Sequence, residues 1–296
     1  MKMKEDIKMK SLSSLFKTNL FVLETYVVAI EQLHNSCNVN EIKSYQGIIL
    51  RRIVNSLKTM DQMLAFSKDP ISAYSLLRTI ADSICAYCFI YENENIDEVE
   101  FRHFLFLLDG CSQFVNAFPA VLINNEQLEK TEYEINQTEI SQERTNLVDF
   151  QKQLLLYIQN TPIVLTMPKE TEEIIRNRDW KYRSILPYLK KDSFSWLNIY
   201  EKAGADVNFV NILSTFLSQY VHGLFLSNTK NPSSKVHYTL IYDVAITLER
   251  RLISAIIKCF KEDNVETLML NHIDLNKMAD LDIDRKSLLS YFRDKI

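Results

Sequence analysis

Two pairs of polar residues are spaced so that each pair lies on one face of a helix. Arg78 and Asp82 are four residues apart in "SLLRTIADS", and Ser218 and His222 are four residues apart in "TFLSQYVHGLFL". Residues four positions apart are neighbours on a helix surface. An arginine can bind an anionic group while a carboxylate orients it, and a histidine transfers protons near neutral pH. These side chains therefore indicate a site for an anionic ligand.

Each pair also has a structural interpretation. Arg78 and Asp82 lie at the edge of an apolar stripe, so they are also expected as a partly buried ion pair that stabilises its helix. His222 directly precedes Gly223, at the expected end of its helix. The helix dipole favours a protonated imidazole there, which can cap the terminal carbonyls. Both interpretations stay open on the sequence alone.

Two further motifs are more typical of structure than of chemistry. Arg102 and His103 are adjacent in "EFRHFLFLL", so their side chains point about 100° apart and at most one belongs to a site. A solvated arginine and a boundary histidine are expected. Cys85 and Cys88 fall in mid-helix among apolar residues, whereas a redox pair normally lies at a helix N-terminus and zinc needs two further ligands. Core packing is therefore favoured, and no metal or other cofactor is indicated.

A basic run over residues 176–191, "RNRDWKYRSILPYLKK", contains Arg178 and Arg183 among Trp180, Tyr182 and Tyr188. Arginine interleaved with aromatic residues can bind single-stranded nucleic acid, because bases stack on aromatic rings. A solvated loop that is anchored by its aromatic side chains explains the same residues and is the favoured interpretation. Arg178 and Arg183 are kept as candidate binding residues.

Helical periodicity dominates the segments that must position these residues. Asp69 and Pro70 predict a helix start, with aspartate as the N-cap and proline at the first helical position. Gly204 is expected in a left-handed conformation after a short helix that begins near Ser193 or Ser195. The best candidate for a strand is "TPIVLTM" at 161–167. The helices are expected at about 11–35, 41–67, 71–91, 98–117, 169–176, 207–222, 233–261 and 284–296.

Composition indicates one all-α domain over residues 1–296, folded as a multi-helix bundle. Hydrophobic residues make up 47% of the 296 positions, and only 4 glycines and 6 prolines occur. So few turn residues disfavour many-turned β folds and doubly wound α/β folds. Residues 124–150 are polar and lack glycine and proline. They are expected as a solvated helix or helical hairpin that projects from the body, with disorder as the alternative.

Charge and targeting signals narrow the class of protein. The formal net charge of −4 gives no support for a general nucleic-acid binder, although local basic patches remain compatible with it. No run of about 18 apolar residues occurs, so no membrane helix is expected, and no secretory signal is recognised. The five cysteines are odd in number and mostly in apolar surroundings. They are typical of reduced thiols in a cytoplasmic protein.

The order of motifs resembles a family of uncharacterised bacterial all-α proteins, classed as a domain of unknown function. The shared features are a helix with Leu-Leu-Arg and a downstream helix that ends in Leu-Ser-x-x-Val-His, here "SLLRTIADS" and "LSQYVHG". The resemblance spans roughly residues 50–225. It implies functional roles for Arg78, Arg102, Ser218 and His222, with Asp82 in place of a common glutamate.

That family is loosely similar to the higher-eukaryote-and-prokaryote nucleotide-binding (HEPN) superfamily of α-bundles, many of which are ribonucleases in phage defence and toxin systems. The similarity implies a metal-independent ribonuclease that acts on RNA or nucleotides. The superfamily motif has an arginine four to six residues before the histidine, whereas "STFLSQYV" precedes His222. Arg78 or Arg102 from another helix would have to complete the site. The alternative function is a non-catalytic binding or assembly module, which acts through a protein partner or as a homodimer.

Overall fold

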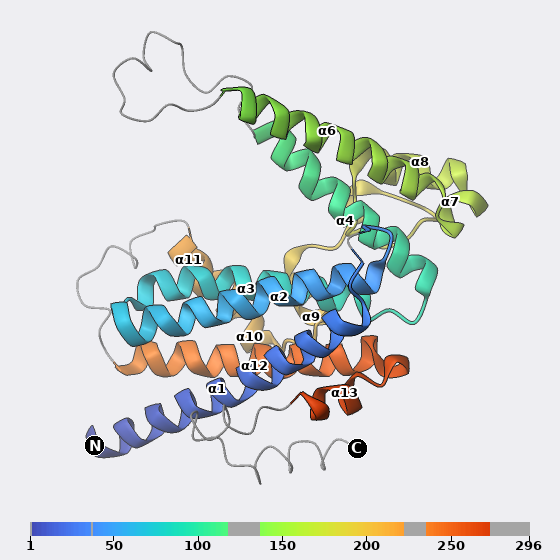
Figure 1. Cartoon of the computed structure of the whole chain (residues 1–296). Coiled ribbons are helices and arrows are strands. Elements are labelled where there is room, and N and C mark those ends of the chain that lie inside the picture. The colour runs from blue at the N-terminus through green and yellow to red at the C-terminus, as the bar shows by residue number, and fades with distance from the viewer. Residues whose placement is uncertain (1, 37, 118–136, 222–234, 273–296) are drawn as a thin grey trace. The chain divides into compact units, whose positions relative to one another are not determined.

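The computed structural model describes residues 2–36, 38–117, 137–221 and 235–272 (Figure 1). The described residues form helices and connecting turns and contain no strand, which confirms the predicted all-α bundle. Contacts group the chain into two compact units. Unit 1 comprises Met1–Glu92 and Trp196–Ile296, and unit 2 comprises Asn93–Ser195. Whether the two units form the single domain expected over residues 1–296 stays a prediction.

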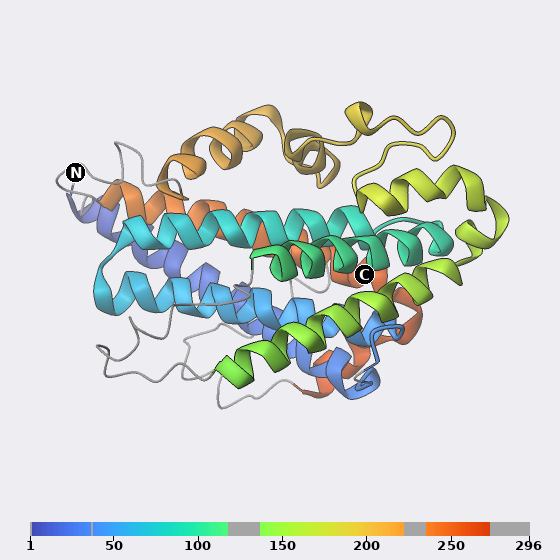
Figure 2. The same cartoon turned by 90° about the horizontal axis from the view of Figure 1, so that it is seen from above.

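Four long helices form a closed bundle in unit 1. They are α1 (Lys2–Leu33), α2 (Ile42–Gln62), α3 (Pro70–Tyr91) and α12 (Lys235–Cys259). Helix α1 packs against α2 and α12, and α3 packs against the same two helices (Figures 1 and 2). Each helix therefore has two neighbours in the bundle and buries an apolar stripe between them.

The bundle core is built from side chains that recur every three or four residues. Gly47 of α2 faces α1, where a Cβ would lie 3.4 Å from Ile30 Cγ2, an ordinary van der Waals contact. The carboxylate of Asp69 accepts hydrogen bonds from the backbone N–H groups of Ile71 and Ser72, both at 3.1 Å. This cap starts α3 at Pro70, as the sequence predicts. The fully buried core side chains include Leu23, Tyr26, Leu50, Leu57, Leu77, Ile84, Ile241, Leu252 and Ile256.

Short helical segments pack on the outside of the four-helix bundle. Helices α9 and α11 both contact α3, while α13 packs on α1. Gly204 follows α9 with a φ of 87°, the predicted left-handed conformation. The expected regular helix over 207–222 contains a π-helical turn, η3, which widens the helix by one residue before α11. The segments are α9 (Trp196–Lys202), α10 (Val207–Asn211), η3 (Ile212–Phe216), α11 (Leu217–Val221) and α13 (Val265–Asn271).

Unit 2 is an antiparallel helix pair followed by two short helices and a long loop. Helix α4 (Ile96–Ala117) packs against α6 (Gln137–Gln159). The ring of Phe104 stacks on Tyr157 at a centroid distance of 5.5 Å. Helices α7 (Pro162–Thr166) and α8 (Pro168–Asn177) follow α6, and the loop of residues 178–195 comes after them.

Several predicted elements differ from the structure. The strand expected at 161–167 is wrong: Pro162 opens helix α7 there, because proline suits the first helical position. Helix α4 starts two residues earlier than expected, since the Asn95 side chain caps the N–H groups of Asp97 and Glu98. The second half of the polar stretch 124–150 is helical from Gln137 onward. Residues 118–136 and the helix expected at 284–296 lie outside the described residues.

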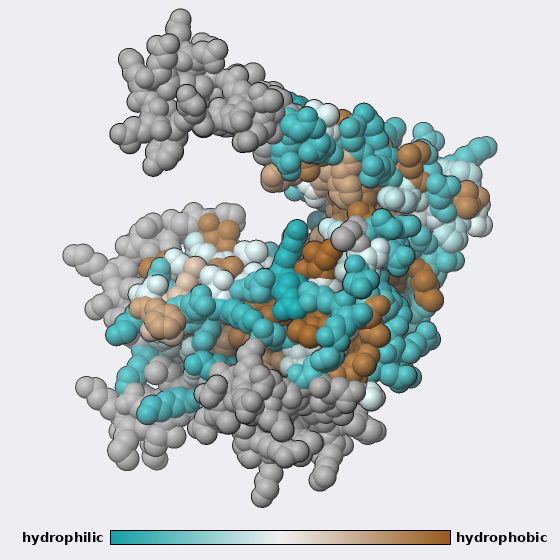
Figure 3. Space-filling model, in the orientation of Figure 1, coloured by the Kyte–Doolittle hydropathy of each residue, from teal (hydrophilic) through white to brown (hydrophobic). Residues whose placement is uncertain are grey.

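The surface of the described residues is mixed in polarity. On the face shown in Figure 3, hydrophilic and hydrophobic residues are interspersed over the described parts of the chain. Within the described ranges, no helix is both long enough and apolar enough to cross a membrane.

Candidate functional site

Arg78 and Asp82 form the predicted ion pair on α3. The stripe of α3 that faces the core buries Leu77, Ile80 and Ala81 completely or almost completely. Arg78 and Asp82 lie at the edge of this stripe, and their side chains are 13% and 31% exposed. An Arg78 Nη1–H group donates to Asp82 Oδ1. The i, i+4 spacing therefore produces a contact, and it leaves both groups partly accessible to solvent.

Two neighbouring segments bring hydroxyl groups to this pair. Tyr200 of α9 donates a hydrogen bond from its hydroxyl to Asp82 Oδ1 at 2.6 Å, and its ring centroid lies 5.3 Å from the guanidinium carbon of Arg78. Arg78 Nε–H donates to Ser218 Oγ of α11 at 3.3 Å. Arg78, Asp82, Tyr200 and Ser218 are called the α3 seam below. The seam joins α3 to α9 and α11, which follow it in the sequence by more than 100 residues.

The guanidinium of Arg78 is the one group of the seam that could bind an anion. Burial raises the pKa of Tyr200 to about 12, although the nearby charge of Arg78 acts against the shift. The phenol therefore stays protonated at neutral pH and keeps donating to Asp82. A guanidinium carries five N–H donors, of which Asp82 and Ser218 account for two. Arg78 is held by these partners and its side chain is 13% exposed, and a guanidinium with free donors can bind a carboxylate or phosphate.

Aromatic packing sets the register of α11 on α3. Tyr220 stacks on Tyr74 at a centroid distance of 4.5 Å, one turn of α3 before the Arg78–Ser218 contact. The two helices are therefore antiparallel, and the π-helical turn η3 directly precedes the residues that make both contacts. Such turns are frequent at functional sites. The proposed site residue His222 lies outside the described residues, because the described part of α11 ends at Val221.

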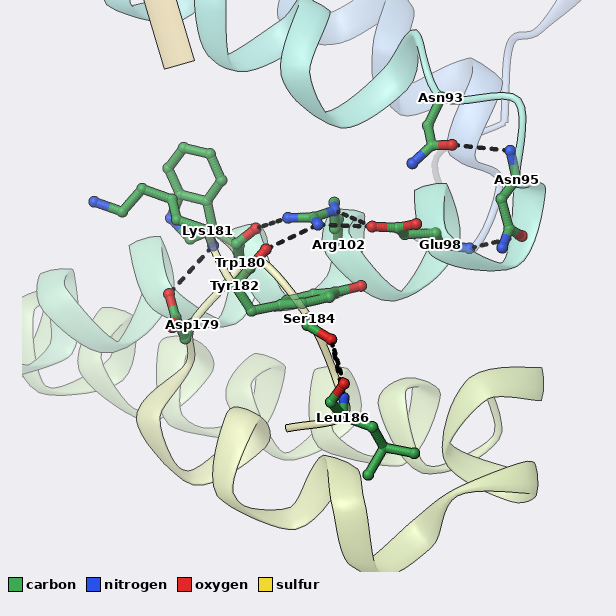
Figure 4. Close-up of polar contacts among 10 residues, drawn as sticks. All are labelled: Asn93, Asn95, Glu98, Arg102, Asp179, Trp180, Lys181, Tyr182, Ser184 and Leu186. Carbon is green, nitrogen blue, oxygen red and sulfur yellow. Dashed lines mark hydrogen bonds and ion pairs between the residues drawn. The ribbon is translucent and has the colours of Figure 1, made fainter. Parts of the chain in front are cut away.

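Arg102 occupies a different environment, in the interior of unit 2 (Figure 4). Its Nε–H and Nη2–H groups donate to Glu98 Oε1 at 2.9 and 2.6 Å. Nη1–H donates to the carbonyl of Trp180 at 2.7 Å and Nη2–H to the carbonyl of Tyr182 at 2.9 Å. Arg102 is 3% exposed and His103 is 0% exposed, so the expectation of a solvated arginine beside a boundary histidine is wrong.

The contacts of Arg102 are those of a structural tie. Its guanidinium carbon lies 3.9 Å from the ring centroid of Tyr182, and its donors hold the backbone of the 178–195 loop against α4. A phosphate would have to displace Glu98 or two buried carbonyls to reach it. The sequence predicts a phosphate-binding role for Arg78 or Arg102; the contacts of Arg102 favour a role in the packing of unit 2, and its place in the site stays a prediction.

The basic run is a loop anchored by its aromatic residues. Trp180 and Tyr182 are only 4% and 2% exposed, so they cannot serve as stacking platforms for nucleobases. The buried carboxylate of Asp179 accepts from Tyr188 Oη–H at 3.0 Å, from Ser193 and from the backbone N–H of Lys181. The loop is thereby folded around Asp179. The exposed cations on its outside are Arg176, Arg183, Lys190 and Lys191.

Arg178 and Arg183 differ in their local role. Arg178 ends α8 in a left-handed conformation with a φ of 52°, and its backbone N–H bonds to the last turn of the helix. Arg183 is exposed and places its guanidinium carbon 4.7 Å from the ring centroid of Phe194. Only Arg183 of these two is both exposed and pre-oriented by a ring.

The cysteines are packing residues in the described structure. Cys85, Cys88, Cys111 and Cys259 are unpaired. Burial raises the pKa of Cys85 to about 12, and that of Cys88 well above its usual value, so neither is a reactive thiolate at neutral pH. Among the described residues, no group of three or more histidine, cysteine or acidic side chains is arranged to hold a metal ion.

Tyr200 and Asp179 were not singled out by the sequence. Tyr200 lies in "SWLNIYEKAG", more than a hundred residues after Arg78, and no local spacing links the two. Asp179 is surrounded by cations in the sequence, which is a weak signal for a buried carboxylate that organises them. Comparison of the chain with protein-family models, curated proteins and solved structures found no match. Function is therefore inferred from side-chain geometry and from the sequence motifs.

Proposed function

We propose that this chain is a HEPN-like helical protein of phage-defence or toxin type, which acts on RNA or a nucleotide at the α3 seam. The proposal rests on the environment of the Arg78 side chain. Its guanidinium is held between a carboxylate, a phenol ring and a hydroxyl, and its side chain remains 13% exposed. Such an arrangement supports recognition of a phosphate by a fixed, partly desolvated cation.

The residues of the seam have separate roles in the proposal. Arg78 contacts a phosphate oxygen and stabilises the negative charge that grows there during phosphoryl transfer. Asp82 and Tyr200 fix the guanidinium from one side, and Ser218 fixes it from the other. His222 enters from the sequence alone as the general acid or base, which requires no metal ion. Arg102 is left out, because its donors are committed to Glu98 and to two backbone carbonyls.

The loop of unit 2 has a secondary role in the proposal. Arg183 and Lys191 offer exposed positive charge to the backbone of a nucleic acid, as does Lys190, which also pairs with Asp179 at 3.4 Å. Arg178 contributes charge at the end of α8. Because Trp180 and Tyr182 are buried, binding here is proposed to rest on phosphates and not on stacking of bases on these two rings. Such binding is independent of base sequence and weakens steeply as the salt concentration rises.

The proposal is tested by expressing the protein in bacteria and examining growth and total RNA. Wild type is expected to slow growth and fragment RNA, whereas Arg78→Ala and His222→Ala are expected to do neither. Arg52→Ala is the matched control, because Arg52 is an exposed arginine of α2 in the same unit. Normal growth with intact RNA in cells that contain soluble wild-type protein would remove the ribonuclease activity from the proposal.

A non-catalytic assembly module is the second candidate, favoured by exposed apolar side chains. Phe66 is 83% exposed, and Leu165 is 68% exposed. Large exposed apolar residues are common at protein interfaces. Light scattering after size exclusion tests the homodimer form of this candidate: a dimer in wild type that dissociates in Phe66→Ser or Leu165→Ser supports it, and a monomer at all concentrations contradicts it.

A further inference from the structure

A tyrosine and a histidine form a hydrogen-bonded pair next to the α3 seam. Tyr74 lies one turn before Arg78 on α3 and is fully buried. Its hydroxyl oxygen is 3.0 Å from Nδ1 of His237 and 3.4 Å from the carbonyl oxygen of the same residue. His237 lies in the first turn of α12 and is only partly buried. The pair therefore joins α3 to α12 at the end of the seam where Tyr220 packs.

The tyrosine ring is held firmly. Tyr220 stacks on it at 4.5 Å, and Phe216 and His237 meet it edge-on at 5.3 and 5.7 Å between ring centroids. Burial raises the pKa of Tyr74 well above its usual value. The hydroxyl consequently keeps its proton over the physiological pH range and can donate one hydrogen bond while it accepts another.

The two acceptors of Tyr74 let the imidazole adopt either neutral tautomer. When Nε2 carries the proton, the hydroxyl donates to Nδ1. When Nδ1 carries the proton, Nδ1–H donates to the hydroxyl oxygen and the hydroxyl donates to the carbonyl of His237. The second arrangement also suits the imidazolium. Nε2 can therefore gain or lose a proton without leaving a buried hydrogen-bonding group unpaired, which is a requirement for an acid–base residue.

We infer that His237 is a further proton-transfer residue of the α3 seam and that Tyr74 positions its imidazole; this rests on the proposed function. In the cleavage of an RNA phosphodiester, Nε2 of His237 accepts the proton of the 2′-hydroxyl as that oxygen bonds to phosphorus. The bond from phosphorus to the 5′-oxygen breaks, and the leaving oxygen takes a proton from water. The imidazolium then returns its proton to the hydroxide. The products are a 2′,3′-cyclic phosphate and a 5′-hydroxyl.

Several other titratable groups lie on the helices that surround the Tyr74–His237 pair. Tyr220 on α11 and Tyr238 on α12 have raised pKa values because of burial, so both are neutral. Lys235 lies two residues before His237 on α12. Asp69 at the start of α3 acts on Tyr238 and favours positive charge nearby. A phosphate dianion bound beside the ring favours the imidazolium form of a histidine.

The test is a pH titration of the histidine ring signals by nuclear magnetic resonance, with inorganic phosphate as the probe. His237→Gln identifies the signal. We expect the pKa of His237 to rise when phosphate binds, and both the pKa and the ratio of neutral tautomers to change in Tyr74→Phe. Tyr157→Phe, a partly buried tyrosine of unit 2, is the control and should change neither. His237→Gln is expected to slow RNA cleavage by about 10²- to 10⁴-fold and to retain phosphate binding.

The outcomes separate the two proposals. If phosphate binds to wild type and not to Arg78→Ala, but the pKa and the tautomers of His237 stay unchanged in phosphate and in Tyr74→Phe, the inference is overturned and the proposed site stands. If phosphate does not bind to wild type at all, the proposed site fails and the inference fails with it. Full cleavage by a folded His237→Gln variant also overturns the inference.

Discussion

Arg78 in unit 1 and Arg102 in unit 2 are each paired with a carboxylate one helical turn away. Arg78 shares its guanidinium among Asp82, Ser218 and the ring of Tyr200, and its side chain is 13% exposed. Arg102 gives its donors to Glu98 and to the carbonyls of a loop, and its side chain is 4% exposed. The helix spacing is the same in both regions, whereas the third partner differs.

The third partner decides what each arginine can do. Arg102 donates to two backbone carbonyls of the loop, so its removal leaves these acceptors without the guanidinium that holds them to α4. Hydroxyl groups can exchange partners, so Arg78 can turn part of its donor set toward a ligand. An i, i+4 pair in a sequence therefore predicts an ion pair but does not distinguish a structural arginine from a binding one.

The largest effect on the free energy of unfolding is expected from Arg102→Met, which tests whether Arg102 is needed for packing. The change leaves Glu98 and two buried carbonyls without their donor, so the free energy of unfolding of unit 2 should fall by about 3 kcal/mol. Urea denaturation followed by the fluorescence of Trp180, in a Trp196→Phe background, measures it. Arg102→Lys keeps the charge but not the forked donors and should recover less than half of the loss. A fall below about 1 kcal/mol would contradict the structural role.

The next effect concerns a buried acidic side chain, Glu249 in the core of unit 1. It is 0% exposed, and neither carboxyl oxygen forms a hydrogen bond of normal geometry within the described residues. Burial raises its pKa well above 4.5, with Asp61 adding to the shift and Asn19 opposing it. Unlike Arg102, this group is accommodated by staying neutral.

The sign of the pH dependence follows from that raised pKa. The contribution of the proton on Glu249 to stability is complete below the unfolded-state pKa and is lost as pH rises through the folded-state pKa. Glu249→Gln should therefore be more stable than wild type at pH 8, and the difference should shrink toward pH 4. Thermal unfolding across this pH range measures it. A difference between the two proteins that does not vary with pH contradicts the buried neutral acid.

Arg78→Met is expected to cost only about 1 to 2 kcal/mol in the free energy of unfolding, because Asp82 is partly exposed and keeps its bond from Tyr200. If this variant destabilises unit 1 as much as Arg102→Met destabilises unit 2, the two arginines do not differ in their structural role. Denaturation followed by Trp196 in a Trp180→Phe background gives the value for unit 1.

The smallest effect on stability is expected from Arg183→Ser in the loop of unit 2. Its side chain is exposed, so the free energy of unfolding should change by less than about 0.5 kcal/mol. If the loop binds RNA, the slope of log affinity against log salt should decrease by about one phosphate contact. Equal slopes for wild type and Arg183→Ser in a filter-binding series would remove Arg183 from the interface.

Local patterns in the sequence predict most of the fold and part of the site. Asp69 and Pro70 mark the start of α3 because capping depends on adjacent residues, and the Arg78–Asp82 pair follows from helix geometry. The burial of Arg102 and the contact of Tyr200 with Asp82 were not predicted, because both depend on segments about 80 to 120 residues away. The β-branched residues of "TPIVLTM" favoured a strand, but Pro162 starts a helix there.

The proposed function requires that Arg78 binds a phosphate, whereas Arg102 stabilises the fold of unit 2. Isothermal titration calorimetry of inorganic phosphate at low salt tests it directly, with wild type, Arg78→Lys and Arg102→Lys compared at matched circular dichroism. Lysine keeps the charge at each position and removes the forked donors. We expect the affinity for phosphate to fall at least about tenfold in Arg78→Lys and to stay at the wild-type value in Arg102→Lys. Equal affinity in wild type and Arg78→Lys, or no binding to wild type, would contradict it.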